Sequence, residues 1–109
     1  MVSYFVRYRG DASDPAQFAA YYAQHHVAIL RRFPGISSLT LHLPHSSSDP
    51  FPVNPGGTFM LAQMTFEDGA TLDRALQSDA RREARADFAR LPRFSGEVTH
   101  EAMSARVIF

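Results

Sequence analysis

Hydrophobic and polar residues alternate in four stretches of this 109-residue chain, and two stretches with helical spacing lie between them. Alternation predicts strands, because successive side chains of a strand point to opposite faces. The expected strands are 2–9, 36–43, 58–66 and 97–109, and the expected helices are 15–33 and 71–91, the second broken near Ser78 and Asp79. The order β-α-β-β-α-β predicts an α+β, ferredoxin-like fold: a four-stranded antiparallel sheet with both helices on one face. At this length we expect one domain, residues 1–109.

The sheet face turned away from the helices is expected to be too apolar to lie in water. Among its polar residues stand five large hydrophobic ones: Phe5, Ile36, Phe59, Leu61 and Ile108. A second copy packed against this face would cover it. We therefore predict a homodimer in which two sheets form a dimeric α+β barrel.

The composition excludes several kinds of chemistry. The chain has no cysteine and no tryptophan, and all eleven basic residues are arginine. Without cysteine there is no thiolate nucleophile or thiolate metal site, and without lysine there is no Schiff base. Eleven acidic residues balance the eleven basic ones, so no nucleic-acid partner is expected. No apolar run approaches the roughly 20 residues that span a bilayer, and the first residues lack a secretory pattern, so we expect no membrane partner and a cytoplasmic protein.

The first expected helix turns one of two adjacent histidines inward. At about 100° per residue, His26 lies next to the apolar stripe of Phe18 and Tyr22, whereas His25 lies on the opposite flank. One interpretation of His26 is a core histidine bonded to a neighbouring hydroxyl or carbonyl. The other is a pocket-lining imidazole that acts as a general acid or base near neutral pH.

The same stretch carries a family resemblance. The run from Phe18 to Ile36, with its aromatic pair, two histidines and Pro-Gly, resembles the first helix and second strand of the ethyl tert-butyl ether degradation (EthD) family. The later segment 78–88 is also similar. The resemblance implies a dimeric barrel with a helix–sheet pocket for small organic molecules, usually in catabolism, and it singles out His26. Two features depart from the family: Ala28 stands where a proline is common, and the cysteines of the methylisomerase branch are absent.

Other sites are less well supported by the sequence. His25 and His26 point about 100° apart on a helix and can hardly bind one ion, so no metal is expected. A haem-using monooxygenase of a related barrel family stays an alternative. The arginines of 79–93 alternate with Asp79, Glu83 and Asp87, which is typical of a solvated helix. Asp79 is expected either as a helix N-cap or as a carboxylate at the pocket mouth.

Together these observations predict a protein that binds a small, partly apolar organic molecule between helices and sheet. Whether it is an enzyme stays open; if it is, we expect cofactor-independent isomerase or lyase chemistry by proton transfer. His26 would be the acid/base, and the segment from Pro44 to Gly57 would gate access. The alternative is a non-catalytic accessory or ligand-sequestering protein that serves a partner oxygenase. The candidate substrate-binding residues are Tyr22, Tyr4, Ile29, Met64 and Asp79.

Overall fold

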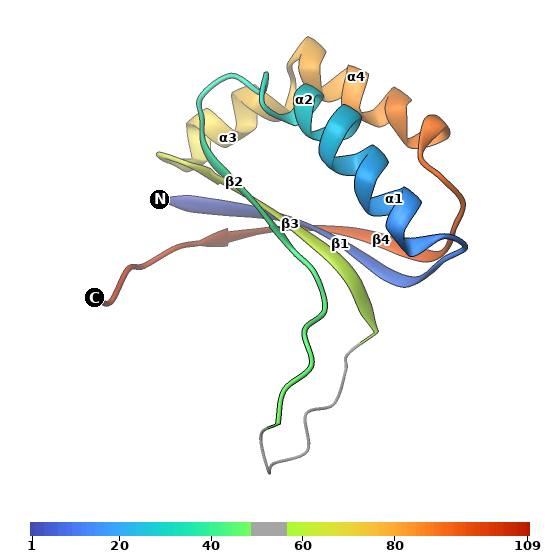
Figure 1. The fold of residues 1–109 in the computed structure, drawn as a ribbon. Helices are drawn as coiled ribbons and strands as arrows, with labels where there is room; N and C mark the ends of the chain where they lie inside the picture. The colour runs from blue at the N-terminus through green and yellow to red at the C-terminus, as the bar shows by residue number, and fades with distance from the viewer. Residues whose placement is uncertain (49–56) are drawn as a thin grey trace.

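The computed structural model describes residues 1–48 and 57–109 and contains the elements in the predicted order. These elements are β1 (Val2–Ala12), α1 (Pro15–Tyr21), the π-helical turn η1 (Tyr22–His26), α2 (Val27–Leu30), β2 (Ile36–His42), β3 (Thr58–Phe66), α3 (Gly69–Leu76), α4 (Asp79–Asp87), the 3-10 turn η2 (Phe88–Arg90) and β4 (Phe94–Ser104). The strands form one antiparallel sheet in the order β2-β3-β1-β4, and all helices cover the same face (Figure 1). The predicted ferredoxin-like α+β fold is confirmed.

The core lies between the helices and the helix-facing side of β1 and β3. Burial alternates along both strands as the sequence predicts, and the helices contribute their apolar stripe to the same core. The largest completely buried side chains come from both layers: Tyr8, Tyr22, Phe18, Phe66, Met60 and Met64. A strand needs this alternation when the helices cover one of its faces and leave the other face uncovered.

A π-helical turn interrupts the first helix at Tyr22–His26, where the sequence predicts a continuous α-helix to Phe33. The buried positions Phe18, Tyr22, His26 and Leu30 follow one another at intervals of four residues. On an α-helix that interval drifts by about 40° per step, because a turn holds about 3.6 residues. The wider π turn absorbs the drift and keeps the four side chains on the sheet-facing side.

The first and last strands, β1 and β4, begin or end at other residues than the sequence predicts. β1 continues through Gly10 to Ala12, and β4 begins at Phe94, because Gly10 and Gly96 pair instead of breaking their strands. β4 ends at Ser104 and not at Phe109. Its partner at that point is Val2, the first residue of β1, so residues 105–109 have no further strand to pair with.

Side-chain caps begin three of the helices. Asp14 accepts a hydrogen bond from the Gln17 amide, and Asp68 accepts one from Thr71, so that Gly69 starts α3. Ser78, and not Asp79, caps α4 by accepting from the Arg81 amide. The predicted helix break is therefore confirmed at Ser78, and a serine hydroxyl takes the cap that we had considered for the Asp79 carboxylate.

The face of the sheet away from the helices is less apolar than expected. Phe59 lies in a register shift of β3, and its ring contacts Phe18 and Phe94 on the helix side at 5.3 and 5.9 Å between centroids. Ile36 packs against the core at a second shift, and Ile108 lies beyond the sheet. Phe5 and Leu61 remain, half-buried.

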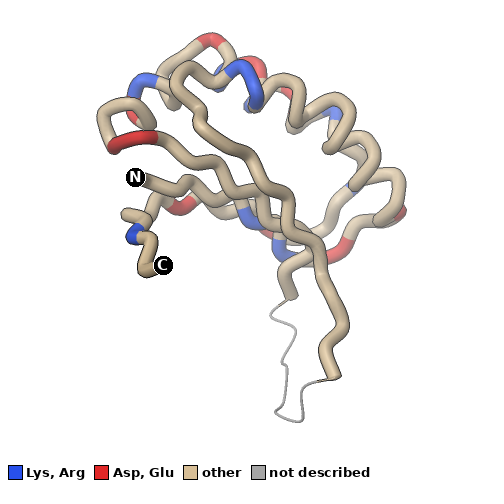
Figure 2. Tube along the Cα trace, turned by 60° about the vertical axis from the view of Figure 1, so that its left-hand side comes forward, with Lys and Arg blue, Asp and Glu red and all other residues tan. Residues whose placement is uncertain are grey.

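Charged residues of both signs are interspersed along the traced chain (Figure 2), in line with the net charge of zero. Over residues 1–48 and 57–109, no helix has the length and apolar character needed to cross a bilayer.

The Gly10–Gly96 pair generates a stability prediction. Both residues have positive φ angles, 137° and 154°, and a Cβ on Gly96 would overlap the Arg9 carbonyl group. Gly96→Ala should therefore lower the free energy of unfolding by about 2 kcal/mol or more, measured by urea denaturation. Ser95→Ala, at the exposed neighbouring position, should change it by less than about 0.5 kcal/mol. Equal stability of the two variants would contradict the prediction.

Candidate functional site

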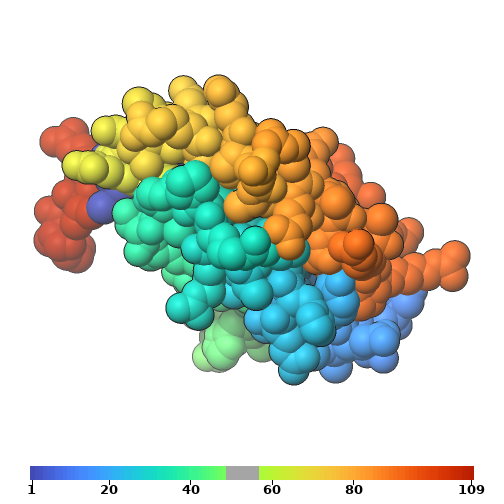
Figure 3. Space-filling view, turned by 90° about the horizontal axis from the view of Figure 1, so that it is seen from above, coloured from blue at the N-terminus to red at the C-terminus, as the bar shows by residue number. Residues whose placement is uncertain are grey.

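A buried histidine–carboxylate pair joins the two helical segments. His26 of η1 and Asp87 of α4 are 2 % and 3 % exposed, and His26 Nδ1 lies 2.9 Å from Asp87 Oδ2. Seen from above, the helices lie side by side over the sheet (Figure 3). An ionised carboxylate can only accept, so Nδ1–H donates to Asp87, and the neutral ring carries its lone pair on Nε2.

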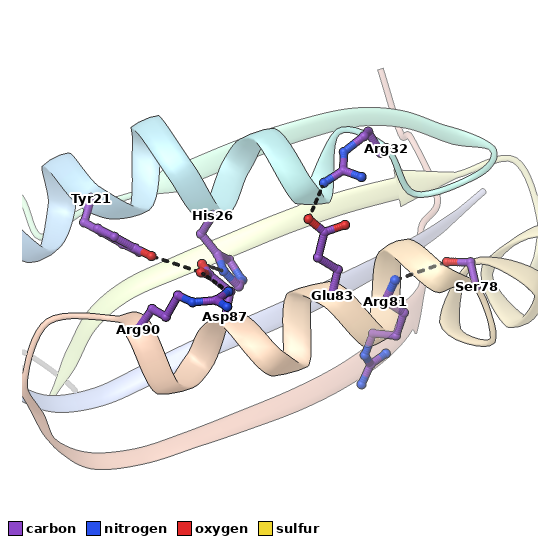
Figure 4. Close-up of polar contacts among 8 residues, drawn as sticks. All are labelled: Tyr21, His26, Arg32, Ser78, Arg81, Glu83, Asp87 and Arg90. Carbon is purple, nitrogen blue, oxygen red and sulfur yellow. Dashed lines mark hydrogen bonds and ion pairs between the residues drawn. The ribbon is translucent and has the colours of Figure 1, made fainter.

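Two further groups hold the Asp87 carboxylate. The Tyr21 hydroxyl donates to Oδ1 at 2.9 Å, and the Arg90 guanidinium lies 3.8 Å from the same oxygen (Figure 4). Burial alone would raise the pKa of Asp87, but the hydrogen bonds from His26 and Tyr21, with the charge of Arg90 and that of His26 when it is protonated, hold the pKa below its usual range. Asp87 is therefore ionised at neutral pH and can stabilise a protonated His26.

The other edge of the imidazole borders a small cavity. His26 lines a space of about 20 Å³, which is room for about one water molecule. Within the described residues, His26 Nε2 has no hydrogen-bond partner. The ring is held by Tyr22 and Phe88, at 4.7 and 5.6 Å between centroids. This arrangement leaves one fixed, basic nitrogen at the cavity.

Two buried phenols lie near the site: Tyr22 contacts the imidazole of His26, and Tyr8 contacts Tyr22. Tyr22 is 0 % and Tyr8 1 % exposed, their rings are 5.6 Å apart, and neither hydroxyl has a hydrogen-bond partner in the part of the chain that the structure describes. Burial raises the pKa of both hydroxyls, and the neighbouring Tyr22 adds to the effect on Tyr8. Both hydroxyls therefore stay protonated. Unpaired buried hydroxyls are costly, and here they offer donors to a polar atom of a ligand.

A groove that is larger than this cavity adjoins it, and the groove lies between α4, η2 and β4. Its volume is about 420 Å³, and it shares Arg85, Phe88 and His100 with the cavity at His26. The Phe88 ring lies between the two spaces, 6.5 Å from Tyr8 and 5.6 Å from His26. Burial, with the charges of Arg81 and Arg85, lowers the pKa of His100, so this histidine is neutral at pH 7.

The cavity brings together four of the predicted site residues: His26, Tyr22, Tyr4 and Met64. Ile29 is buried in the core and does not line this cavity. Asp79 is also elsewhere: its exposed carboxylate pairs with Arg82 on the solvent side of α4. Since Ser78 caps the helix, nothing turns Asp79 toward the cavity mouth.

The sequence interpretation missed the partners of His26. Asp87 was expected on the solvated side of its helix, which is wrong. It follows Ala80 and Ala84, both buried, at helical spacing, and this small-residue stripe was the available signal. Tyr21 lies beside the exposed His25, yet its hydroxyl donates to Asp87 across the helix interface.

Other expectations concern metal binding and a gating segment. No group of three histidine, aspartate or glutamate side chains within 1–48 and 57–109 could hold a metal ion. His25 is exposed, with its ring 4.7 Å from that of Tyr21. The segment predicted to gate access, Pro44 to Gly57, lies mostly outside the described residues.

Comparison with known proteins identifies the fold. No family model and no curated protein match the sequence. Among solved structures, an ethyl tert-butyl ether degradation family protein from Bacillus halodurans C-125 matches with a TM-score of 0.76, at 18% identity, over 97% of this chain and 99% of that chain. The chain has the EthD fold. The resemblance inferred from the first helix is thus confirmed as a likeness of structure.

Two further matches to the EthD fold are oxygenases from Streptomyces. A monooxygenase of Streptomyces coelicolor, in complex with nanaomycin D, matches with a TM-score of 0.67, at 18% identity, over 99% of this chain and 89% of that chain. SnoaB of Streptomyces nogalater, a cofactor-independent oxygenase, matches with a TM-score of 0.62, at 19% identity, over 97% of this chain and 93% of that chain.

The state of Asp87 gives a pH prediction. Because its folded pKa lies below the usual value near ~3.9, its charge contributes stability that is present above that value and lost as pH falls through the lower folded pKa. Asp87→Asn should lower the free energy of unfolding at pH 7 by about 1–3 kcal/mol, and the deficit should shrink between about pH 4 and pH 2.

Denaturant unfolding over that pH range measures the effect. Asp73→Asn, at an exposed position of α3, is the matched control and should differ from the parent by less than about 0.5 kcal/mol. A deficit that stays constant down to pH 2 would show that the Asp87 charge does not contribute.

Proposed function

We propose that this protein binds a small, partly apolar organic molecule between its helices and sheet and that His26 moves a proton on it. The observation that carries the proposal is the buried His26–Asp87 pair, with His26 lining a cavity and its Nε2 unpaired among the described residues. A histidine whose tautomer is fixed by a carboxylate is the usual arrangement of a general base. We place this activity in the breakdown of an organic compound, as the fold comparison suggests.

The proposed step is transfer of a proton from a carbon atom next to a carbonyl group. Nε2 takes the proton, the Asp87 carboxylate stabilises the resulting imidazolium, and negative charge develops on the carbonyl oxygen. The Tyr22 and Tyr8 hydroxyls are the donors that could stabilise this charge, since neither has a hydrogen-bond partner in residues 1–48 and 57–109. Return of the proton to another atom completes an isomerisation, and loss of a leaving group completes a lyase reaction.

Access to His26 depends on Phe88 in this proposal. A cavity of about 20 Å³ is too small for an organic molecule, but the groove of about 420 Å³ on the far side of the Phe88 ring has room for one. Phe88 is half-buried and lies in a short 3-10 turn. Rotation of its ring would join the two spaces, and the ligand would then contact both His26 and the phenols.

The similar oxygenases are compatible with the same first step. SnoaB is a cofactor-independent oxygenase, and an organic substrate that reacts with oxygen unaided must first become electron-rich, which deprotonation achieves. We assign this deprotonation to the same residues as in the isomerase or lyase proposal, with His26 as the base.

The second candidate is a binding protein without catalysis, which sequesters a ligand or serves a partner oxygenase. The small size of the cavity at His26 favours it, because a ligand confined to the groove would not reach Nε2. In that case the His26–Asp87 pair holds the helices together.

We also propose that the protein is a homodimer. Phe5, Leu61 and Met103 lie on the sheet face that no helix covers, as the strand register places Met103 beside Ser3 and Leu61 beside Arg7. Met103 is 51% exposed, and the following Val107, Ile108 and Phe109 are still more exposed. A second copy would remove these apolar side chains from water.

Proton exchange tests the catalytic proposal. The protein is incubated in D₂O with candidate lactones, and deuterium at the carbon next to the carbonyl group is followed by NMR. His26→Gln should slow the exchange by about 100-fold or more, because it removes the base. His25→Gln, at the adjacent exposed position, should leave the rate unchanged. Exchange that persists in His26→Gln would refute the role of His26, and saturable binding without exchange would favour the second candidate.

Sedimentation tests the dimer. The parent should sediment as a species of twice the 12.2 kDa chain mass. Leu61→Arg, on the uncovered sheet face, should shift it toward the monomer, since a buried unpaired charge destabilises an interface. Val98→Arg, on the other face of the sheet, should leave the dimer intact. A parent that sediments as a monomer at micromolar concentration would contradict the proposal.

A further inference from the structure

The groove between α4, η2 and β4 has several aromatic rings in its wall. Tyr8, Phe18, Phe88 and Phe94 contribute to its wall, and the centroid distances of Tyr8 to Phe94 and of Phe18 to Phe94 are both 5.7 Å. At about 420 Å³ the groove is large enough for a fused two-ring molecule. A flat, aromatic occupant would match such walls, since rings pack edge-to-face or offset against other rings.

Two of the three arginines of helix α4 lie at the cavity or the groove, whereas the third, Arg82, pairs with Asp79 on the solvent side. Arg81 and Arg85, one turn apart, line the cavity mouth, and Arg85 also lines the groove. Figure 4 shows Arg81 pointing toward β4, away from the Arg32–Glu83 ion pair. The Asp87 carboxylate pairs with His26. Helical periodicity therefore places the acidic side chains of α4 on other sides of the helix than Arg81 and Arg85.

The arginines at the groove lack acidic partners. In the described part of the chain, Arg81, Arg85 and Arg93 form no ion pair, and no carboxylate lines the cavity or the groove. Arg81 instead lies over the Tyr4 ring, 5.8 Å from its centroid. Two like charges one turn apart repel each other, and an anion between them would relieve that repulsion.

We propose that the ligand of this site is an aromatic anion: a fused or extended ring system in the groove, with an acidic group held by Arg81 and Arg85. The acidic group can be a carboxylate or an ionised phenol, because a guanidinium pairs with either oxygen anion. The inference deepens the proposed function and rests on it, since it takes the groove as the ligand site. It places the ring beside Phe88, on the path to His26.

Two fluorescent probes of the same skeleton test the charge requirement. 8-Anilinonaphthalene-1-sulfonate is anionic, and N-phenyl-1-naphthylamine is its neutral counterpart. The double variant Arg81→Gln/Arg85→Gln should weaken binding of the sulfonate at least tenfold and change binding of the neutral probe less than twofold. Arg82→Gln removes a charge from the same helix on its solvent side and should leave both affinities unchanged.

A second pair of variants locates the probes. Val98→Trp places a bulky ring in the groove and should abolish binding of both probes, whereas Asp73→Trp, at an exposed position of α3 away from the groove, should have no effect. Circular dichroism and thermal unfolding confirm that each variant folds. If Val98→Trp blocks both probes but the double arginine variant changes the affinity for both probes by the same factor, the anion proposal is wrong. The groove would then still be the binding site. If Val98→Trp blocks neither probe, the groove is not the site, and both proposals fail.

Discussion

The hydrogen bond between His26 and Asp87 ties the two helical segments together above the sheet. Both side chains are buried, so if either one is removed, bulk water does not replace the lost hydrogen bond of the other. Tyr21 and Arg90 complete the set of groups around the carboxylate. The position of α4, and with it the cavity and the groove, depends on this pair. The structure therefore uses one polar contact to assemble both its helix layer and its candidate base.

The fold was largely predictable because its signals are local. Alternation in 58–66 and the caps at Asp14 and near Ser78 report on neighbouring residues, and they give the right elements. The failures involve contacts between distant segments. Whether Gly10 and Gly96 break a strand or pair across two strands depends on a register that neither segment specifies alone. Likewise, the loss of pairing after Ser104 is fixed by where β1 begins.

The same distinction applies to the site. The inward position of His26 follows from helical spacing, and His26, Tyr22, Tyr4 and Met64 do line one cavity. The sequence does not single out Asp87 as the partner of His26, because all acidic residues of α4 have arginines within one turn and look alike in this respect. Only the stripe formed with Ala80 and Ala84 distinguishes it. Tyr8 becomes noticeable only when its hydroxyl, like that of Tyr22, proves to have no hydrogen-bond partner among the described residues, which is a property of packing.

The π turn at Tyr22–His26 holds one residue more than an α-helix would use to cover the same angle. Deletion of a single codon within it would let the segment close into a regular α-helix over the same angle, so the residues before and after the turn would keep their orientation. The interval from Tyr22 to His26 would shorten from four residues to three, which still leaves both side chains on one face of an α-helix. A lineage with this fold can thus gain or lose the π turn by one small insertion or deletion while its strands, its core and the contact of His26 with Asp87 stay as they are.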